Sequence, residues 1–294
     1  MSILSDFQYH APKTKAEVLA LLAEIGEKSK ILAGGTDLII MLKEKMIETE
    51  NLINIADVKE LSGIKFTENG VEIGACTKIA EIENSKELTA KGYNALVHAA
   101  GELGSYQVRS MATLGGNISL SSPAGETPTP LAALNASVVI ESVRGERVVK
   151  AEDFILGNRK NVLEKDEMLT KFIIPAPAIN SAATYGYIGL RNAMEIDAVN
   201  MAVNIELEAD KKTIKSVKLV MGSVSPKPIV SEAVPALLVG KELNDELIKS
   251  VGEAAMGEAK PISDIRASAE YRKDVVGALA RRLTKEAYDL AMEV

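Results

Sequence analysis

Two pairs of adjacent glycines constrain this chain more than any other feature of its sequence. Gly34 and Gly35 stand in KILAGGTDLII, residues 30–40, between an apolar run and a segment with helical spacing. Gly115 and Gly116 stand in MATLGGNISL, residues 111–120, and are again followed at once by a small polar residue. Because glycine has no Cβ, a ligand can approach the main chain of such a pair closely. A tight turn is the commonest role of glycine, so each pair taken alone is equally compatible with a simple helix entry.

The segments around the first pair predict a corner between a strand and a helix. TKAEVLALLAEI predicts a helix from Thr14 to Ile25, with Thr14 as N-cap and Glu17 completing a capping box. KSKILAGG predicts a short buried strand that ends at the glycines, and TDLIIMLKEKM predicts a helix with Thr36 as N-cap. After the second pair, SLSSPAGETPTP holds three of the ten prolines without periodicity, which predicts a functional or disordered loop.

The remaining segments predict an α+β fold in two domains. Strand patterns in the first half are NLINI, GIKF and VEIGA with a turn at residues 68–70, a hairpin turning at Arg144-Gly145, and EMLTKFIIPAP. APAINSAA predicts a boundary between domains 1–176 and 182–294. Beyond it, three strand-like segments and a long amphipathic helix, Ala267–Glu293, predict an antiparallel sheet with helices against it.

Composition excludes several classes of function. The net charge of -7 arises from mixed charges without a basic stripe, so neither nucleic acid nor an anionic membrane is an expected partner. No run approaches the ~18 apolar residues of a membrane span, and no secretory signal is evident, so we expect a cytoplasmic protein. Cys76 is the only cysteine, and His10 and His98 are the only histidines, which argues against disulfides and against a zinc or iron–sulfur site in this chain. We predict no metal ligand and no catalytic residue.

The glycine pairs point instead to phosphate. N–H groups at the start of a helix bind phosphate oxygens with help from the helix dipole. There is no G-x-G-x-x-G after a strand and no glycine-lysine phosphate loop, which excludes a kinase or GTPase. Two pairs, with Thr36 and Asn117 beside them, suit the two phosphates of a dinucleotide held from two sides. Glu195 and Asp197 alternate along a predicted strand, so we expect a solvated pair and not an acid–base catalyst.

Four segments in order resemble the flavoprotein subunit of molybdenum hydroxylases, a family that includes xanthine dehydrogenase, carbon monoxide dehydrogenase and nicotinate dehydrogenase. They are ILAGGTDLIIMLK, GSYQVRSMATLGGNISLSSPAGETPTPLAALNA, LRNAMEIDAVNMAV and ISDIRASAEYRKDVVGALARRL, and the resemblance covers nearly the whole chain. It implies an FAD-binding domain of the PCMH (vanillyl-alcohol oxidase) type, followed by a smaller CO-dehydrogenase-flavoprotein C-terminal α+β domain. It also implies FAD as the cofactor.

The resemblance further implies which residues contact FAD, with main-chain N–H groups at the glycines as the main donors. These residues are Lys30, Ile31, Leu32, Ala33, Gly34, Gly35, Thr36, Asp37, Thr113, Leu114, Gly115, Gly116, Asn117, Glu126, Leu169 and Tyr187. Two departures from the family pattern concern the flavin. Tyr187 stands where many relatives have Lys, and Glu195-Ile196-Asp197 replaces the more usual Asp-Ile-Ala or Asp-Ile-Ser. A lost cation would destabilise an anionic reduced flavin, so the departures bear on redox potential and acceptor preference.

The function implied by the resemblance is electron transfer within a multi-subunit enzyme. Electrons would pass from a large molybdopterin-binding subunit, through two [2Fe-2S] clusters in a small subunit, to FAD in this chain and then to NAD or another acceptor. Xanthine or another purine is the first expectation for the substrate, with nicotinate, other N-heterocycles, aldehydes and carbon monoxide as alternatives. Two rival functions are a self-contained flavin oxidoreductase of the same fold and an assembly subunit that binds no cofactor.

Overall fold

The computed structural model describes residues 6–191 and 194–294, and its N-terminal part is built on a small parallel sheet. Two outer strands, β1 and β2, flank the central β3 (β1, Gln8–His10; β2, Ser29–Leu32; β3, Asn51–Asn54). α1 (Lys15–Ile25) connects β1 to β2 through the short 3₁₀ helix Gly26–Lys28. The predicted capping box is confirmed, because Thr14 Oγ1 accepts from the Glu17 N–H and the Glu17 carboxylate accepts from the Thr14 N–H.

The predicted helix after the first glycine pair is shorter than the sequence indicates. α2 runs only over Leu38–Lys43, and Asp37, not Thr36, occupies its N-cap without a side-chain capping bond. The prediction of Thr36 was wrong because Gly35, at φ 75°, turns the chain one residue further before the helix begins. Lys45 takes a left-handed conformation at φ 55° and limits the helix at its other end.

A five-stranded antiparallel sheet forms the second part of the N-terminal half, in the order β4-β5-β10-β6-β7. Its strands are β4 (Ile64–Thr67), β5 (Gly70–Gly74), β6 (Ser137–Ser142), β7 (Gly145–Lys150) and β10 (Met168–Pro175). Both predicted hairpin turns are confirmed, since Thr67 pairs with Gly70 and Ser142 pairs with Gly145. A two-stranded ribbon, β8 (Ile155–Gly157) with β9 (Lys160–Asn161), precedes β10.

Short helices surround this sheet and carry the second glycine pair. They are the 3₁₀ helix Lys59–Leu61, α3 (Ile79–Glu83), α4 (Lys86–Ala90), α5 (Asn94–Glu102), α6 (Tyr106–Arg109), α7 (Leu114–Leu120), α8 (Pro128–Ala133) and α9 (Ala151–Phe154). The prediction of a loop over the whole of SLSSPAGETPTP was wrong at both ends. Ser119 and Leu120 close α7, and Pro128 stands in the first turn of the buried α8, where its fixed φ suits a helix start and its missing N–H costs nothing.

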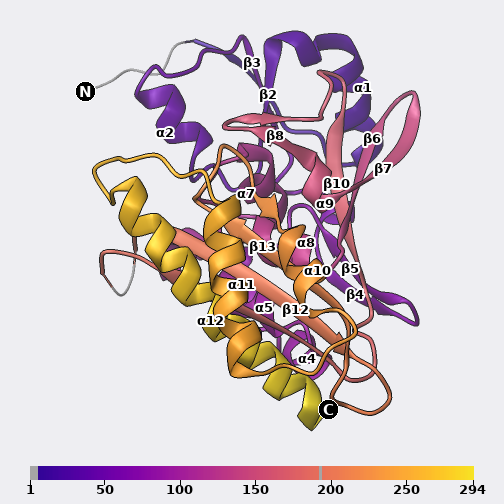
Figure 1. Cartoon of the computed structure of the whole chain (residues 1–294). Helices are drawn as coiled ribbons and strands as arrows, with labels where there is room; N and C mark the ends of the chain where they lie inside the picture. The colour runs from indigo at the N-terminus through magenta and orange to yellow at the C-terminus, as the bar shows by residue number, and fades with distance from the viewer. Residues whose placement is uncertain (1–5, 192–193) are drawn as a thin grey trace.

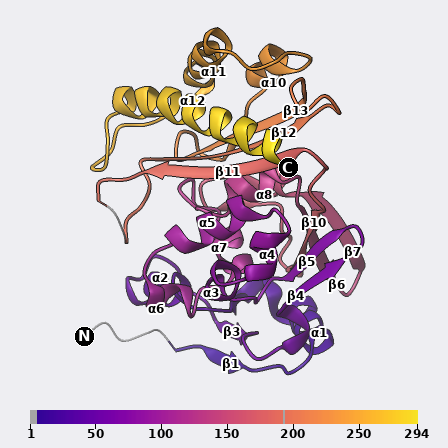
Figure 2. The ribbon, with the colours of Figure 1, turned by 90° about the horizontal axis from the view of Figure 1, so that it is seen from below.

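The C-terminal half is an antiparallel sheet covered by helices, as predicted. The sheet order is β11 (Ser181–Ile188), β12 (Val199–Leu207), β13 (Ile214–Gly222) and β14 (Ile229–Val230). The helices are α10 (Ala233–Leu238), α11 (Asp245–Glu258) and α12 (Ala269–Glu293). Figure 1 shows α12, in yellow, running across the front of the sheet, and Figure 2 shows α10 to α12 on one face with α5 and α8 on the other.

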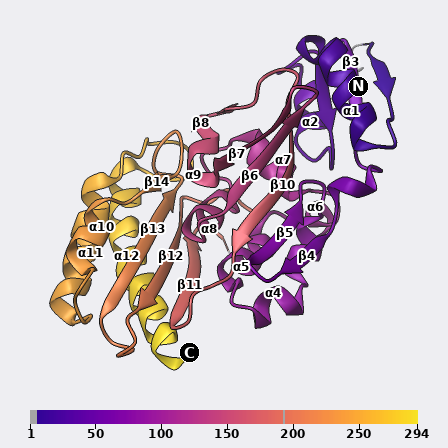
Figure 3. The ribbon, with the colours of Figure 1, turned by 90° about the vertical axis from the view of Figure 1, so that its right-hand side faces the viewer.

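The apolar side of α12 carries the packing of this half. Val275, Val276, Leu279 and Leu283 are buried against the sheet, as their spacing predicts. The opposite face of the sheet belongs to a buried cluster that also includes residues of the N-terminal half. Tyr185 and Ala202 lie there with Leu96 of α5 and Leu131 of α8. The two halves, seen side by side in Figure 3, therefore share buried apolar surface, and the exact domain boundary stays a prediction.

Candidate functional site

The first glycine segment leaves β2 and enters α2 as an open loop. Lys30 is exposed, whereas Ile31 and Ala33 pack on the small core beneath the parallel sheet. From Gly34 to Leu38, none of the main-chain N–H groups donates a hydrogen bond to any part of the chain that the structure describes. Such a run of free donors needs an external acceptor or water, since main-chain N–H groups are obligatory hydrogen-bonding groups.

The two glycine segments lie against one another, which the sequence had only implied. A Cβ placed on Gly34 would stand 2.2 Å from the carbonyl oxygen of Met111, and 2.9 Å from Cα of Ala112. Gly34 is therefore required by the close approach of the chain that leads into the second pair. Gly35, at φ 75°, is required by its backbone conformation. The pairs are two parts of one site.

The second glycine segment forms the first turn of α7, with Thr113 as N-cap. Its four N–H groups are all engaged: Leu114 donates to Thr77 O, Gly115 to Ala75 O at 2.8 Å, Gly116 to Thr113 Oγ1 at 3.1 Å, and Asn117 to Thr113 O. The resemblance implied that N–H groups of both glycine pairs donate to FAD. In this structure the donors that remain free belong to the first segment alone, because Ala75 O and Thr77 O, just after β5, and the Thr113 cap accept from those of the second.

The two glycines of the second pair have different roles. A Cβ on Gly115 would lie 2.8 Å from both Cβ and O of Ala75, so Gly115 permits α7 to pack closely on the end of β5. Gly116 is exposed, and a Cβ there would meet only the Thr113 hydroxyl, at 2.9 Å. Gly116 is thus the bare surface of the second segment, and it suits the approach of a bulky anionic group.

Glu126 is buried between the glycine segments and the C-terminal half. Its side chain is hydrogen-bonded to Asn117, whose Oδ1 also accepts from Thr127 Oγ1 at 2.5 Å. Glu126 is 9% exposed, and burial raises its pKa to about 7 despite the Asn117 hydrogen bond, with the charge of Asp37 adding to the rise. Because the charge of Asp37 acts on Glu126, Asp37, at the start of α2, lies near it. Glu126, in the loop before α8, is therefore close to Asp37 of the first glycine segment and to Asn117 of the second.

Asp197 extends the same polar group from the C-terminal half. It is 3% exposed, and its Oδ2 accepts from Asn200 Nδ2 at 3.1 Å and from the Tyr185 hydroxyl at 3.4 Å. The expectation of a solvated Glu195 and Asp197 pair was wrong. Both residues precede β12 instead of alternating along it, and Asp197 turns into the interior beneath the loop that carries Glu126. A strand pattern alone could not reveal that this segment is covered.

The remaining predicted residues, Leu169 and Tyr187, lie on either side of this region. The Leu169 side chain is buried in the core, next to a bulge of β10 whose Thr170 O accepts from the Ala75 N–H. Tyr187 stands opposite Asn200 in the sheet register and donates its hydroxyl to Glu102 Oε2 at 2.7 Å. This hydrogen bond, together with burial, raises the pKa of Tyr187. A role of either residue in contacting the flavin stays a prediction.

A cavity of about 280 Å³ opens beside the buried acids, between the Ser122–Ala124 loop and the C-terminal half. Asp197 borders it, and three basic side chains from beyond β13 line it: Lys260, Arg266 and Arg272. Arg272 is 4% exposed and donates to Ala198 O and Ser223 O, yet its Nε finds no partner among the described residues, nor does Ser223 Oγ. The predicted site residues do not include these three, although Arg266 and Arg272 lie in ISDIRASAEYRKDVVGALARRL, one of the four segments that carry the resemblance.

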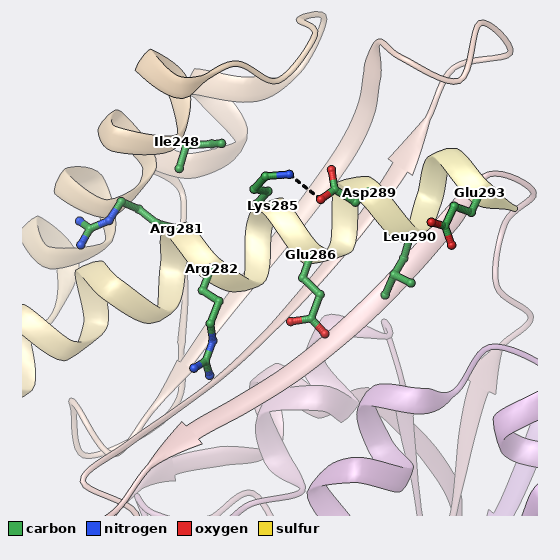
Figure 4. Close-up of a pocket in the computed structure, with 8 residues that line it drawn as sticks. All are labelled: Ile248, Arg281, Arg282, Lys285, Glu286, Asp289, Leu290 and Glu293. Carbon is green, nitrogen blue, oxygen red and sulfur yellow. Dashed lines mark hydrogen bonds and ion pairs between the residues drawn. The ribbon is translucent and has the colours of Figure 1, made fainter.

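A larger hollow of about 570 Å³ lies elsewhere, on the outer surface of α11 and α12. Figure 4 shows its charged side chains of both signs projecting from α12, with an ion pair of 2.5 Å between Lys285 and Asp289. None of the lining residues belongs to the glycine segments or to the buried acid group. We interpret this hollow as a solvated helical face, as the sequence predicts for the polar side of α12.

The glycine segments fit a dinucleotide cofactor and do not fit a metal ion. The free donors at Gly34–Leu38 belong to a segment that packs through Gly34 against the chain entering α7, where Gly116 is exposed, and free main-chain N–H groups suit phosphate oxygens. Among the residues that the structure describes, no group of three or more acidic, histidine or cysteine side chains forms a metal site. Within the same residues, no helix is long and apolar enough to span a membrane.

Comparison with known proteins gives the same assignment over almost the full chain. Residues 5–177 match the family described as the FAD binding domain in molybdopterin dehydrogenase, and residues 184–287 match the CO dehydrogenase flavoprotein C-terminal domain. The glyceraldehyde dehydrogenase medium chain of Sulfolobus acidocaldarius is 34% identical, over 96% of this chain and 98% of that protein. The nicotinate dehydrogenase FAD-subunit of Eubacterium barkeri is 33% identical, over 97% of each.

A solved structure has the same fold throughout. Carbon monoxide dehydrogenase from Hydrogenophaga pseudoflava, in a form that lacks the Mo-pyranopterin moiety of its cofactor, superposes with a TM-score of 0.92 and is 30% identical. The match covers 98% of this chain and 99% of that chain.

Proposed function

Because the chain belongs to the family of FAD-binding medium subunits of molybdenum hydroxylases, we propose that it binds FAD between its two glycine segments and uses it to transfer electrons within such an enzyme. The observation that carries this proposal is the run of free N–H donors at Gly34–Leu38, packed through Gly34 against the entry to α7. When bound, FAD supplies a centre that accepts single electrons and releases electron pairs. The chain itself supplies donors, shape and a largely buried surrounding.

The partners follow from the same proposal. A small subunit would bring [2Fe-2S] clusters and a large subunit would bring molybdopterin and the substrate site. The described part of this chain offers no cluster ligands, since its one cysteine is buried and its pKa is raised to about 11 by burial. Electrons would reach the flavin from the clusters, so this chain needs no acid–base residue aimed at the hydroxylated substrate.

The cavity beside Asp197 suits a negatively charged electron acceptor such as NAD. Three basic side chains line it, two of them, Arg266 and Arg272, paired with Asp264. Two buried polar atoms there, Arg272 Nε and Ser223 Oγ, have no partner in the described part of the chain. A ligand phosphate or carboxamide would satisfy such groups, and leaving them unsatisfied is costly. The acceptor would thus bind at the loop that also carries Glu126. Another anionic acceptor would fit the same features.

The substrate of the whole complex is set by the partner subunit. Xanthine or another purine remains our prediction, and glyceraldehyde, nicotinate and carbon monoxide, which appear in the names of three relatives, are the alternatives. Purification of the tagged chain from its native cell, with mass identification of the bound polypeptides and assays of these four substrates, discriminates among them. Turnover by the isolated chain would instead favour a self-contained flavin oxidoreductase.

The proposal is tested by the absorbance of the purified chain after incubation with FAD. We expect flavin bands that remain after gel filtration, at one FAD per chain. A folded protein that retains no FAD would show that the glycine segments do not form a flavin site. That outcome would favour the rival function, an assembly subunit that binds no cofactor.

A further inference from the structure

Two buried carboxyl groups, Asp197 and Glu126, lie at the junction of the two halves, close enough for the charge of Glu126 to act on Asp197. Asn200 connects Asp197 to the main chain beside Glu126: its Nδ2 donates both to Asp197 Oδ2 at 3.1 Å and to the carbonyl oxygen of Gly125 at 3.3 Å. Thr129 Oγ1 fixes the amide by donating to Asn200 Oδ1 at 3.1 Å. The side-chain hydrogen bonds that reach the two carboxyls come from uncharged groups in the described part of the chain.

The backbone leaves Asn200 little freedom to move away from this position. A Cβ on Gly222 would lie 2.2 Å from Asn200 Oδ1, so the bare main chain of β13 closes one side of the amide. Asn200 and Asp197 therefore hold one arrangement, and Asp197 borders the acceptor cavity from inside. The geometry is that of a fixed acid pair between the glycine segments and the cavity.

The pair cannot be fully ionised near neutral pH. Burial raises the pKa of Asp197 to about 8, and the charge of Glu126 contributes further to the rise. Burial raises that of Glu126 to about 7. Two buried carboxylates that repel one another titrate as a unit, and such a pair retains one proton over the interval between its two apparent pKa values.

Other titratable groups surround the pair on every element packed against it. They are Asp37 at α2, Glu102 on α5, Arg159 between β8 and β9, Tyr185 and Tyr187 on β11, Glu195 before β12, and Lys260, Asp264, Arg266 and Arg272 around the cavity. The acidic groups add to the cost of ionising the pair, whereas Arg266 and Arg272 are already paired with Asp264. The environment therefore favours retention of a proton by the pair.

We propose that Asp197 and Glu126 hold one proton between them and take up a second from solvent when two electrons enter the flavin site. This inference rests on the proposed function. Reduction of a flavin by two electrons and one proton adds one negative charge. The pair begins with one proton and one negative charge and ends neutral, so two electrons and two protons enter together. The electrons come from the iron–sulfur partner, or from dithionite in the experiment below, and the protons come from water.

The proposal assigns to Asp197 a role in positioning a proton for the flavin site. The expected consequence is a reduction potential that depends on pH more steeply than in a chain lacking this acid.

The test measures the reduction potential of the FAD-loaded chain from about pH 6 to about pH 9, one unit beyond the two pKa values on each side. Each proton taken up with an electron pair lowers the potential by about 30 mV per pH unit, since a tenfold change corresponds to that value for a two-electron couple. Between these two pKa values we expect a slope of about 60 mV per pH unit in the wild type and about half of it in Asp197→Asn. Asp210→Asn, in the exposed β12–β13 turn, is the control and keeps the wild-type slope. Equal slopes in wild type and Asp197→Asn overturn the proposal.

A second measurement decides the question without FAD. The folded-state pKa of Asp197 lies above its unfolded value, so its stabilising contribution is complete below about pH 4 and is lost as pH rises through about 8. Asp197→Asn lacks this loss, and its Tm relative to wild type should rise between about pH 5 and about pH 8 and level off above that. Asp210→Asn should show a constant difference over that range, because the pKa of Asp210 is lowered. A Tm difference between Asp197→Asn and the wild type that does not depend on pH contradicts the proposed protonation of the pair.

The two measurements keep this inference separate from the proposed function. If the wild type takes up no FAD, the proposed function is contradicted, but the stability measurement still tests the protonation of the pair. A wild type that binds FAD while Asp197→Asn changes neither the slope nor the pH profile fails this inference alone.

Discussion

Gly116 offers the clearest test at the scale of a single residue. Its Cβ position is open apart from the Thr113 hydroxyl, and its main chain lies on the face where the phosphates of FAD are proposed to bind. Gly116→Val should therefore weaken FAD binding at least tenfold, which corresponds to about 1.4 kcal/mol. Valine and glycine differ little in helix propensity, but a Cβ at 2.9 Å from Thr113 Oγ1 would displace the N-cap of α7, so the free energy of unfolding should fall by about 1 kcal/mol. FAD titration monitored by flavin fluorescence, with urea unfolding of the apo chain, measures both.

Gly257 supplies the matched control for this substitution. It lies in the last turns of α11, and a Cβ there would meet no atom within 4 Å. Gly257→Val should bind FAD as the wild type does. Unchanged FAD affinity in Gly116→Val would show that the phosphates do not lie against α7. Gly35→Val is a poorer test than Gly116→Val, because Gly35 has φ 75° and valine would strain the backbone with or without FAD.

At the scale of elements, the site depends on how closely the β2–α2 loop approaches the chain entering α7. Gly34→Ala would place a methyl group 2.2 Å from Met111 O, and main chain cannot give way as a side chain tip can. We expect this substitution to cost about 1–3 kcal/mol of unfolding free energy, as overpacking does elsewhere, and to weaken FAD binding by displacing one segment from the other. Urea midpoints of the apo chain measure the first effect.

Gly257→Ala is the control at this scale and should stabilise slightly or leave the midpoint unchanged, because alanine favours the helix. If Gly34→Ala unfolds at the same urea concentration as the wild type, the two segments do not pack as the structure shows them. If Gly34→Ala is as stable as the wild type but no longer binds FAD, then Gly34 matters for the FAD site and not for the stability of the fold.

At the scale of the whole molecule, the two halves should unfold together. Buried residues of β11 to β13 belong to the same apolar cluster as those of α5 and α8, and Asn204 Nδ2 donates to Ala133 O at 3.1 Å across the junction. Removal of either half would expose this surface to water, which couples their stabilities. We expect one calorimetric transition of the apo chain, coincident with the loss of helical circular dichroism. Two resolved transitions would show independent domains.

FAD provides a further check on this coupling. Its proposed site lies between the two glycine segments of the N-terminal half, and Asp197 of the other half lies near Glu126 beside them. Ligand binding to the native state raises stability by mass action, and in a coupled molecule it raises the single transition as a whole. A shift confined to the N-terminal part would place the cofactor entirely within residues 1–176.

The sequence by itself determined the features that depend on neighbours along the chain. The capping box of α1 follows from Thr14 and Glu17 three residues apart, and the β4–β5 hairpin follows from Asn69-Gly70 between two strand patterns. The two glycine pairs and their order with the C-terminal segments indicated the family and FAD, which the comparisons confirm. Local rules failed by a residue or two where a backbone turn intervened, as at Gly35.

The tertiary structure alone decided what depends on segments far apart in the chain. It placed Gly34 against Met111, engaged the first N–H groups of α7 with Ala75, Thr77 and Thr113 while leaving those of the first segment free, and buried Asp197 near Glu126. None of these relations leaves a periodic or local signal, because each arises only when one element covers another. Covering a carboxyl group removes water from it and raises its pKa, so the same Asp197 that looks solvated in the sequence retains a proton in the fold.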